Sequence, residues 1–219
     1  MDFWYKFGRL MAILFMRTFG RVEIVGAENI PPFGSLIVTP NHQSYADPPL
    51  LTTAFNRPLF YMGKRSLFAN PVVSYLLRSF HVYPVSRDKR DVDAVHWALD
   101  LLDRGKVLAV FPEGTRGKGG LRKAEVGAAY LAQKSGASII PVAITGTEHV
   151  QGFIRIAFPF HRLKVVIGEA YSLPQIEGQA PREVLQSFTD MIMGRIAALL
   201  PPEYQGDYKI SPPPPPRSI

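Results

Sequence analysis

Short apolar runs alternate with segments of helical periodicity along most of the chain. The apolar runs have the length and the flanking polar residues of buried strands, and they lie at 22–26, 35–39, 59–62, 81–85, 107–110, 139–145 and 163–167. Segments with apolar residues three and four positions apart lie between them or follow them, at 48–55, 66–80, 92–103, 126–135 and 181–200. Strands that alternate with helices are typical of an α/β fold. We therefore expect a single domain with a mixed, substantially parallel sheet flanked by helices.

The N-terminal segment has a different pattern. On a helical wheel of about 100° per residue, aromatic and aliphatic side chains between Phe3 and Phe19 share one broad arc, and Lys6, Arg9 and Arg17 lie opposite. A basic face opposite an aromatic face favours a helix that lies in a membrane interface. An amphipathic helix packed on the domain core has the same pattern. No apolar run reaches the roughly 18 residues of a spanning helix, and interrupting charges argue against a signal peptide.

These patterns divide the chain into three parts. We expect a membrane-association helix in 1–21, the α/β domain in 22–200 and a proline-rich tail in 201–219, which forms a strap followed by a polyproline end. Ligands of open α/β sheets bind at the carboxyl ends of strands. Polar residues directly after predicted strands are therefore candidate site residues, and they are His42, Lys64, Arg87 and Glu113.

Composition narrows the class of partner. With 25 lysines and arginines against 18 aspartates and glutamates, the chain has a formal charge of +7. An anionic partner is therefore expected, either nucleic acid, an acidic membrane surface or a phosphorylated substrate. No nucleic acid partner is expected, because the basic residues stand at strand ends and do not interleave with aromatic residues. The absence of cysteine excludes a disulfide scaffold and a thiolate nucleophile. No Gly-x-Ser-x-Gly motif occurs, so the usual signature of a serine acyl-enzyme is absent. No clustered metal-ligand spacing occurs either, so no metal site is expected.

A histidine and a carboxylate lie five positions apart just after the strand predicted at 35–39. His42 is a candidate general base, and Asp47 is the acid that would orient it. Five positions is a poor spacing for one helix face, so the pair can meet only if the chain turns. Pro48 disfavours helical geometry at Asp47, which predicts Asp47 as a helix N-cap with Pro48 in the first helical position. A simple cap beside an unrelated loop histidine would give the same sequence.

A second polar stretch, Glu113-Gly114-Thr115-Arg116, follows the strand predicted at 107–110. Arginine binds phosphate in a fork geometry, and glycine allows backbone N–H groups to approach an anion closely. Considered alone, the stretch fits two interpretations equally well, namely a phosphate-binding loop and a strand-end turn with a surface ion pair.

Together, and in this order, the two stretches resemble the motifs of the glycerolipid acyltransferase family, of the bacterial 1-acylglycerol-3-phosphate acyltransferase type, over roughly 22–170. The resemblance implies that 22–200 is an acyltransferase domain with His42 and Asp47 as catalytic residues. It implies substrate binding by Lys64, Arg87, Glu113, Gly114, Thr115 and Arg116. The third motif of the family usually begins with glycine, where this chain has His81.

The reaction that the resemblance implies is transfer of a fatty acyl group to 1-acylglycerol-3-phosphate, which gives phosphatidic acid. The co-substrate would be an acyl-carrier protein or coenzyme A thioester, with no cofactor. Alternative acceptors are glycerol-3-phosphate, another lysophospholipid or a glycolipid. A catalytically silent membrane-surface binding protein is the alternative from another class. The implied location is the cytoplasmic face of the cell membrane, with peripheral or monotopic attachment to an anionic surface.

Overall fold

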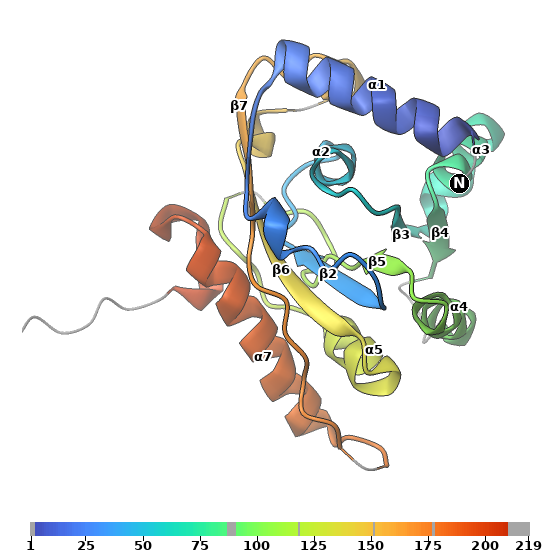
Figure 1. Cartoon of the computed structure of the whole chain (residues 1–219), viewed down its shortest axis with the longest axis vertical. Coiled ribbons are helices and arrows are strands. Elements are labelled where there is room, and N and C mark those ends of the chain that lie inside the picture. Colours follow the sequence, from blue (N-terminus) through green and yellow to red (C-terminus); the bar gives the residue numbers. More distant parts are fainter. Residues whose placement is uncertain (1–2, 87–90, 118, 151, 177, 210–219) are drawn as a thin grey trace, which may run out of the picture.

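A computed structural model of the chain describes residues 3–86, 91–117, 119–150, 152–176 and 178–209. Each predicted strand is present, and the helices fall between the strands as expected (Figure 1). The strands are β1 Arg21–Val25, β2 Leu36–Pro40, β3 Leu59–Lys64, β4 Val82–Val85, β5 Val107–Ala109, β6 Ser138–Thr145 and β7 Arg162–Ile167. The helices are α1 Phe3–Phe19, α2 Asp47–Ala54, α3 Pro71–Ser79, α4 Val92–Asp103, α5 Gly127–Ser135, α6 Phe153–Ala157 and α7 Arg182–Leu199. The short α6 was not predicted.

The seven strands form one sheet in the order β1-β7-β6-β2-β5-β3-β4. Neighbouring strands are parallel except β6 and β7, which pair antiparallel. Strands β2 to β6 therefore run in one direction, and their carboxyl ends lie at one edge. The expected α/β fold with a mixed, substantially parallel sheet is confirmed.

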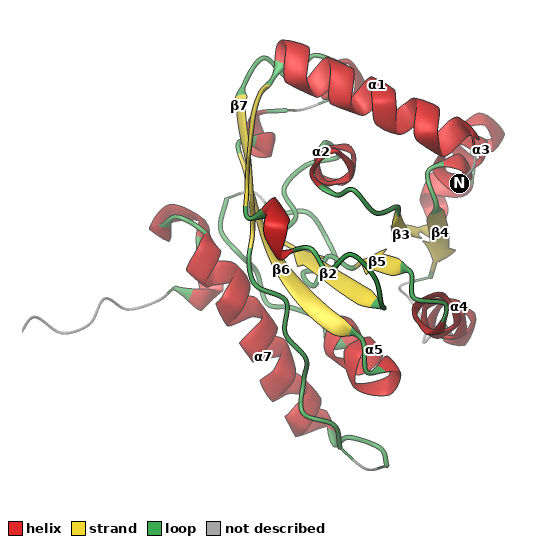
Figure 2. Cartoon of the chain, in the orientation of Figure 1, coloured by secondary structure: helices red, strands yellow, loops and turns green. Residues whose placement is uncertain are grey.

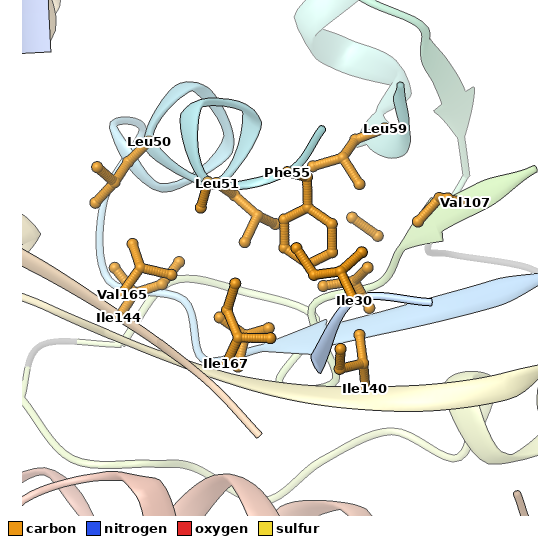
Figure 3. Packing of buried hydrophobic residues seen from close by; sticks show 14 of the residues in the cluster. Ile30, Leu50, Leu51, Phe55, Leu59, Val107, Ile140, Ile144, Val165 and Ile167 are labelled. Atoms are coloured by element: carbon orange, nitrogen blue, oxygen red, sulfur yellow. The ribbon is translucent and has the colours of Figure 1, made fainter. Parts of the chain in front are cut away.

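Helices cover both faces of the sheet (Figure 2). On one face, α2 and the segment after it contribute Leu51 and Phe55, which pack with Ile140 of β6 (Figure 3). On the other face, α4 and α7 contribute Leu102 and Ile192 to a second buried cluster. The central strands are apolar on both sides because each side meets a helix layer. Because both faces of the sheet are packed, the strands that carry the two polar stretches at their carboxyl ends have a fixed position.

The start of α2 differs from the prediction for Asp47. The N-cap position belongs to Ala46, and Asp47 is the first residue of the helix. A cap would accept hydrogen bonds from N–H groups of its own helix. The Asp47 carboxylate instead accepts from the backbone N–H groups of Gln43 and Ser44 in the preceding turn. The same arrangement forms the chain turn that His42 and Asp47 need in order to meet.

Helix α1 packs over α2 with the side opposite to its aromatic arc. Tyr5 and Met16 are its buried residues, and Arg9 Nη2 donates a hydrogen bond to the Phe55 carbonyl at 3.0 Å. Arg9 lies opposite the aromatic arc, as predicted, and this side of the helix faces the domain. Five large apolar residues of the arc are exposed, namely Phe3, Trp4, Phe7, Leu10 and Leu14. Among the described residues, no helix has the length and apolar character required to cross a membrane.

The beginning of the predicted tail, residues 201–209, lies against the segment that follows β5. Leu121 N donates to the Tyr204 carbonyl, and Asp207 N donates to the Leu121 carbonyl, both at 2.9 Å. Lys123 N donates to the Asp207 carboxylate at 3.2 Å. These residues form a strap over 121–124. The run of five prolines lies outside the described residues.

Candidate active site

The two polar stretches meet at the carboxyl edge of the sheet because β2 and β5 are parallel neighbours. His42 follows β2 and Glu113 follows β5, and the backbone N–H of His42 donates to Glu113 Oε1 at 2.8 Å. In the opposite direction, Gly117 N donates to the His42 carbonyl at 2.8 Å. Residues 71 positions apart are thus joined directly.

His42 and Asp47 form a hydrogen-bonded pair. His42 Nδ1 lies 2.7 Å from Asp47 Oδ2, with the Asp47 side chain fully buried and the His42 side chain 16% exposed. An ionised carboxylate can only accept, so with Asp47 in that form Nδ1 is the donor, and Nε2 of a neutral ring then keeps its lone pair. The imidazole also stacks on the Phe111 ring, with ring centroids 4.0 Å apart. The ring is therefore held at Nδ1 and on one face, which is an arrangement suited to proton transfer at Nε2.

Two residues with no predicted role hold this turn in place. The Asn41 side chain donates from Nδ2 to the Ile144 carbonyl at 2.9 Å and accepts at Oδ1 from Ile144 N at 2.6 Å. It thereby extends the pairing of β2 with β6 beyond the last strand residue. Ser44 Oγ donates to the Val150 carbonyl at 2.7 Å. The sequence signal for these two roles was the presence of an amide, Asn41, and a hydroxyl, Ser44, on either side of His42 directly after a strand.

Glu113 is a buried carboxyl whose two oxygens both accept backbone hydrogen bonds. Oε1 accepts from His42 N, and Oε2 accepts from Arg122 N at 3.1 Å. Burial raises the pKa of Glu113 to about 7, against the opposing effect of these two N–H donors. Among the described residues Glu113 forms no ion pair. The carboxyl thus connects the His42 turn to the loop after β5.

The loop of Gly114, Thr115 and Arg116 lies beside the His42 turn. Gly114 has φ +64°, a left-handed conformation that glycine adopts without strain. Thr115 and Arg116 are exposed, and the Arg116 guanidinium carbon lies 3.5 Å from the centroid of the Tyr45 ring. Arg116 therefore rests on an aromatic ring, and the surface ion pair considered for this stretch is not formed with Glu113.

Several backbone N–H groups near the pair are already bonded. Gln43 N and Ser44 N donate to Asp47, Gly114 N donates to the Phe111 carbonyl, and Gly117 N donates to the His42 carbonyl. Stabilising a developing oxyanion requires donors that are available to it. These four groups are committed to the fold of the turn and the loop.

Two predicted site residues remain, Lys64 and Arg87. Lys64 is the last residue of β3, at the same edge and exposed. Strand β4 ends at Val85, and Arg87 lies outside the described residues. Within the described part of the chain, no group of three histidine, aspartate or glutamate side chains could hold a metal ion.

Comparisons with known proteins agree with this geometry. A family model described as Acyltransferase matches residues 21–145, which contain both polar stretches. The 1-acyl-sn-glycerol-3-phosphate acyltransferase of Bacillus subtilis is 27% identical over 198 residues, covering 89% of this chain and 96% of that protein. The protein of the same name from Borreliella burgdorferi is 33% identical over 132 residues, or 59% of this chain and 53% of that protein.

A solved structure has the same fold. The crystal structure of the 1-acyl-sn-glycerophosphate (LPA) acyltransferase PlsC from Thermotoga maritima matches with a TM-score of 0.66 and 27% sequence identity. The match covers 87% of this chain and 77% of that protein. The alignment therefore includes most of the sheet and its helices.

Proposed function

The chain belongs to the Acyltransferase family, and from this premise we propose that it acylates the sn-2 hydroxyl of 1-acylglycerol-3-phosphate to give phosphatidic acid. The acyl donor is a thioester of acyl-carrier protein or coenzyme A, used as co-substrate. The names of the relatives and of the solved structure support this acceptor. The hydrogen bond between His42 and Asp47 at the carboxyl edge of the sheet carries the proposal.

In the proposed reaction His42 acts as general base at Nε2. It takes the proton of the acceptor hydroxyl as that oxygen attacks the carbonyl carbon of the thioester. The tetrahedral intermediate then collapses, the carbon–sulfur bond breaks, and the thiolate receives the proton from His42. One ester bond forms and one thioester bond is lost, so the protons and charges balance without a further reactant.

Asp47 is proposed as the residue that orients His42. Its Oδ2 holds the Nδ1 proton and stabilises the imidazolium formed during the transfer, the role that the acid has in a serine-protease triad. The two N–H groups of Gln43 and Ser44 fix the same oxygen at 2.7 and 2.8 Å. Because three donors converge on one buried oxygen, the carboxylate has little freedom to release the imidazole.

The acceptor phosphate is proposed to bind the loop of Gly114, Thr115 and Arg116, with Lys64 and Arg87 as further cations. The exposure of Arg116 beside the His42 turn supports this assignment. Its guanidinium presents N–H donors suited to a phosphate. Glu113 is proposed to hold the loop in register with His42 through its two backbone hydrogen bonds.

Helix α1, in the 1–21 segment, is proposed to associate with the membrane that supplies the acceptor. Its exposed residues include Phe3 and Trp4, which are 71% and 52% exposed. A helix with aromatic and aliphatic side chains on one side and basic residues on the other is suited to the lipid interface. The 22–200 segment is then the acyltransferase domain, working peripherally at the cytoplasmic face of an anionic membrane.

The test is acyl transfer to 1-acylglycerol-3-phosphate in detergent micelles, with both donor types offered. The wild type is expected to form phosphatidic acid, and His42→Ala is expected to lower the rate by about 10²–10⁴-fold. The matched control is His96→Ala, an exposed histidine on α4, which should retain wild-type activity. A folded His42→Ala variant with wild-type activity would exclude His42 as the base. Silence of the folded wild type with every donor would contradict this acceptor.

A further inference from the structure

Helix α3 has no buried residue, although most of its side chains are apolar. Val72 is 67% exposed, and Leu76 is 49% exposed. On a wheel of about 100° per residue, Val72, Val73, Leu76 and Phe80 fall within one arc, and Ser74 and Arg78 fall outside it. An apolar arc normally packs on a core. Here it faces outward.

The apolar arcs of α3 and α1 meet. An added Cβ on Gly8 of α1 would lie 2.0 Å from the ring of Phe80, so glycine permits the close approach of the two helices. Gly8 is one helical turn after Trp4, an exposed residue of the α1 arc. Figure 1 shows α3 beside the N-terminal end of α1. We name the exposed residues of both arcs the α1–α3 surface, which comprises Phe3, Trp4, Phe7, Leu10, Leu14, Val72, Val73, Leu76 and Phe80.

A stack of aromatic rings holds the two helices in a fixed relation. The His81 ring lies between Tyr5 of α1 and Phe60 of β3, with centroid distances of 4.3 and 4.4 Å. His81 follows α3 directly and has φ +59°. Glycine adopts a positive φ without strain, and the His81 ring gives this chain a contact that a glycine at this position would lack. The α1–α3 surface is therefore part of the folded domain.

Cations lie at the other end of α1. Arg17, Arg21 and Arg162 line a groove of about 910 Å³ between the end of α1 and the starts of β1 and β7. All three are exposed. Arg17 lies in the last turn of α1, one turn after Leu14, so the groove lies at the C-terminal end of α1. Guanidinium groups of this kind bind phosphate.

We propose that α3 docks on an anionic bilayer together with α1, with the α1–α3 surface among the acyl chains and the arginine groove on the lipid headgroups. The inference deepens the proposed function, because a lipid acceptor has to reach the site from a bilayer. The order of the elements along the chain agrees with a bilayer at this surface. Helix α3 follows β3, and the carboxyl end of β3 lies at the edge of the sheet that carries His42. Contiguous exposed apolar area beside cations favours a lipid interface over solvent.

The test is sedimentation with phosphatidylcholine vesicles that contain roughly one quarter phosphatidylglycerol, an anionic fraction chosen to attract cationic surfaces. The double variant Val72→Ser/Leu76→Ser is expected to partition about tenfold more weakly than the wild type, because two apolar side chains leave the lipid. The matched control is Val25→Ser/Met191→Ser, which changes two exposed apolar residues on β1 and α7. The control pair should bind as the wild type does. Equal binding by both double variants, or an equal loss in both, would overturn the role of α3.

The arginine groove is tested with the same vesicles and with pure phosphatidylcholine. Arg21→Gln/Arg162→Gln should lose most of the preference for anionic vesicles and keep the binding to neutral ones, because each cation near the surface contributes about 1 kcal/mol, or roughly fivefold. An unchanged preference would exclude the groove as the headgroup contact. Chromatography without lipid tests the other occupant. A dimer that Val72→Ser/Leu76→Ser dissociates would assign α3 to a second copy of the chain.

Failure of this inference is distinguishable from failure of the proposed function. Vesicle binding needs no activity, and wild-type acyl transfer in detergent micelles needs no bilayer. A wild type that is active in micelles, with α3 variants that bind vesicles normally, overturns only the docking surface. A wild type that binds vesicles through α3 but never acylates the acceptor contradicts only the proposed reaction.

Discussion

The His42 turn and the α1–α3 surface have opposite kinds of contact. In the turn, the side chains of Asn41 and Ser44 form hydrogen bonds with Ile144 and Val150, and the Asp47 carboxylate accepts hydrogen bonds within the turn itself, all at 2.6 to 2.9 Å. On the α1–α3 surface, large apolar side chains contact solvent, for instance Phe3 at 71% exposure. The turn is held by contacts within the protein, whereas the surface is left open to solvent.

The difference predicts two kinds of response to substitution. A directional hydrogen bond between buried groups is either formed or lost, so its removal has a large effect on one function. Apolar contact is proportional to area, so its removal has a graded effect.

The largest effect is expected for Asp47→Asn. The amide can no longer hold His42 in the tautomer that leaves Nε2 unprotonated, and a comparable substitution in a serine-protease triad costs about 10⁴-fold in kcat. We expect kcat to fall by about 10²–10⁴-fold, as for His42→Ala, with a smaller change in KM. The control is Asp93→Asn, an exposed aspartate in the first turn of α4. A folded Asp47→Asn variant with kcat within tenfold of wild type would remove Asp47 from the mechanism.

The next effect concerns stability and comes from Glu113. Its pKa is raised from 4.5 to about 7 by burial, so between these pH values the folded state binds more protons than the unfolded state. The free energy of unfolding should therefore fall as pH rises from about 4 to about 8, by an amount on the order of 3 kcal/mol in total, and then level off. Glu113→Gln should lack this part of the slope. Urea unfolding of both proteins across this range measures it, and parallel curves would contradict the assignment.

Much of the fold was predictable because burial imposes regular patterns. The buried strands β2 and β6 are continuous apolar runs, and the periodicity of α7 matches its buried residues Ile192 and Ile196. Periodicity shows which side of a helix is apolar but not what covers that side. Helix α1 has a comparable pattern and leaves most of its arc exposed. Only the structure distinguishes a core helix from one that faces outward.

The candidate site was predictable in part for the same reason. Motif order and parallel strands predicted that His42 and Glu113 lie at one edge, and the structure places them in hydrogen-bond contact. The position of Asp47 inside α2, and the hold of Asn41 on β6, depend on backbone partners about 100 residues away or on the local turn. Such partners leave no spacing signal in a single sequence.

A smaller effect is expected where α1 meets the domain, at Tyr5. Leu59 N, on a fully buried residue, donates to Tyr5 Oη at 2.9 Å. Tyr5→Phe keeps the stacking on His81 and leaves that N–H without its partner, which should cost about 1–3 kcal/mol of the free energy of unfolding. Tyr75→Phe, on exposed α3, is the control and should change the free energy by less than about 0.5 kcal/mol. Equal stability of both variants would mean that α1 is not held through Tyr5.

The smallest effects on stability are expected for single truncations on the α1–α3 surface. Their effects on vesicle binding should be additive in free energy, unlike the effects of substitutions in the His42 turn. Leu14→Ala on α1 and Val72→Ala on α3 should each change the free energy of unfolding by less than about 0.5 kcal/mol. Each should weaken vesicle binding about two- to fivefold, in proportion to the lost apolar area. The double variant should show the product of the two factors, because distant sites act independently.

The His42 turn should behave in the opposite way. His42→Ala/Asp47→Asn should be no slower than His42→Ala alone, since the two residues act as one unit. Acyl transfer rates for the two single variants and the double variant decide this cycle, beside the vesicle-binding cycle for Leu14 and Val72. If vesicle binding proved non-additive while the losses of rate multiplied, the surface would be a specific binding site. The pair would then be two independent contributors, and the contrast between the two regions would be reversed.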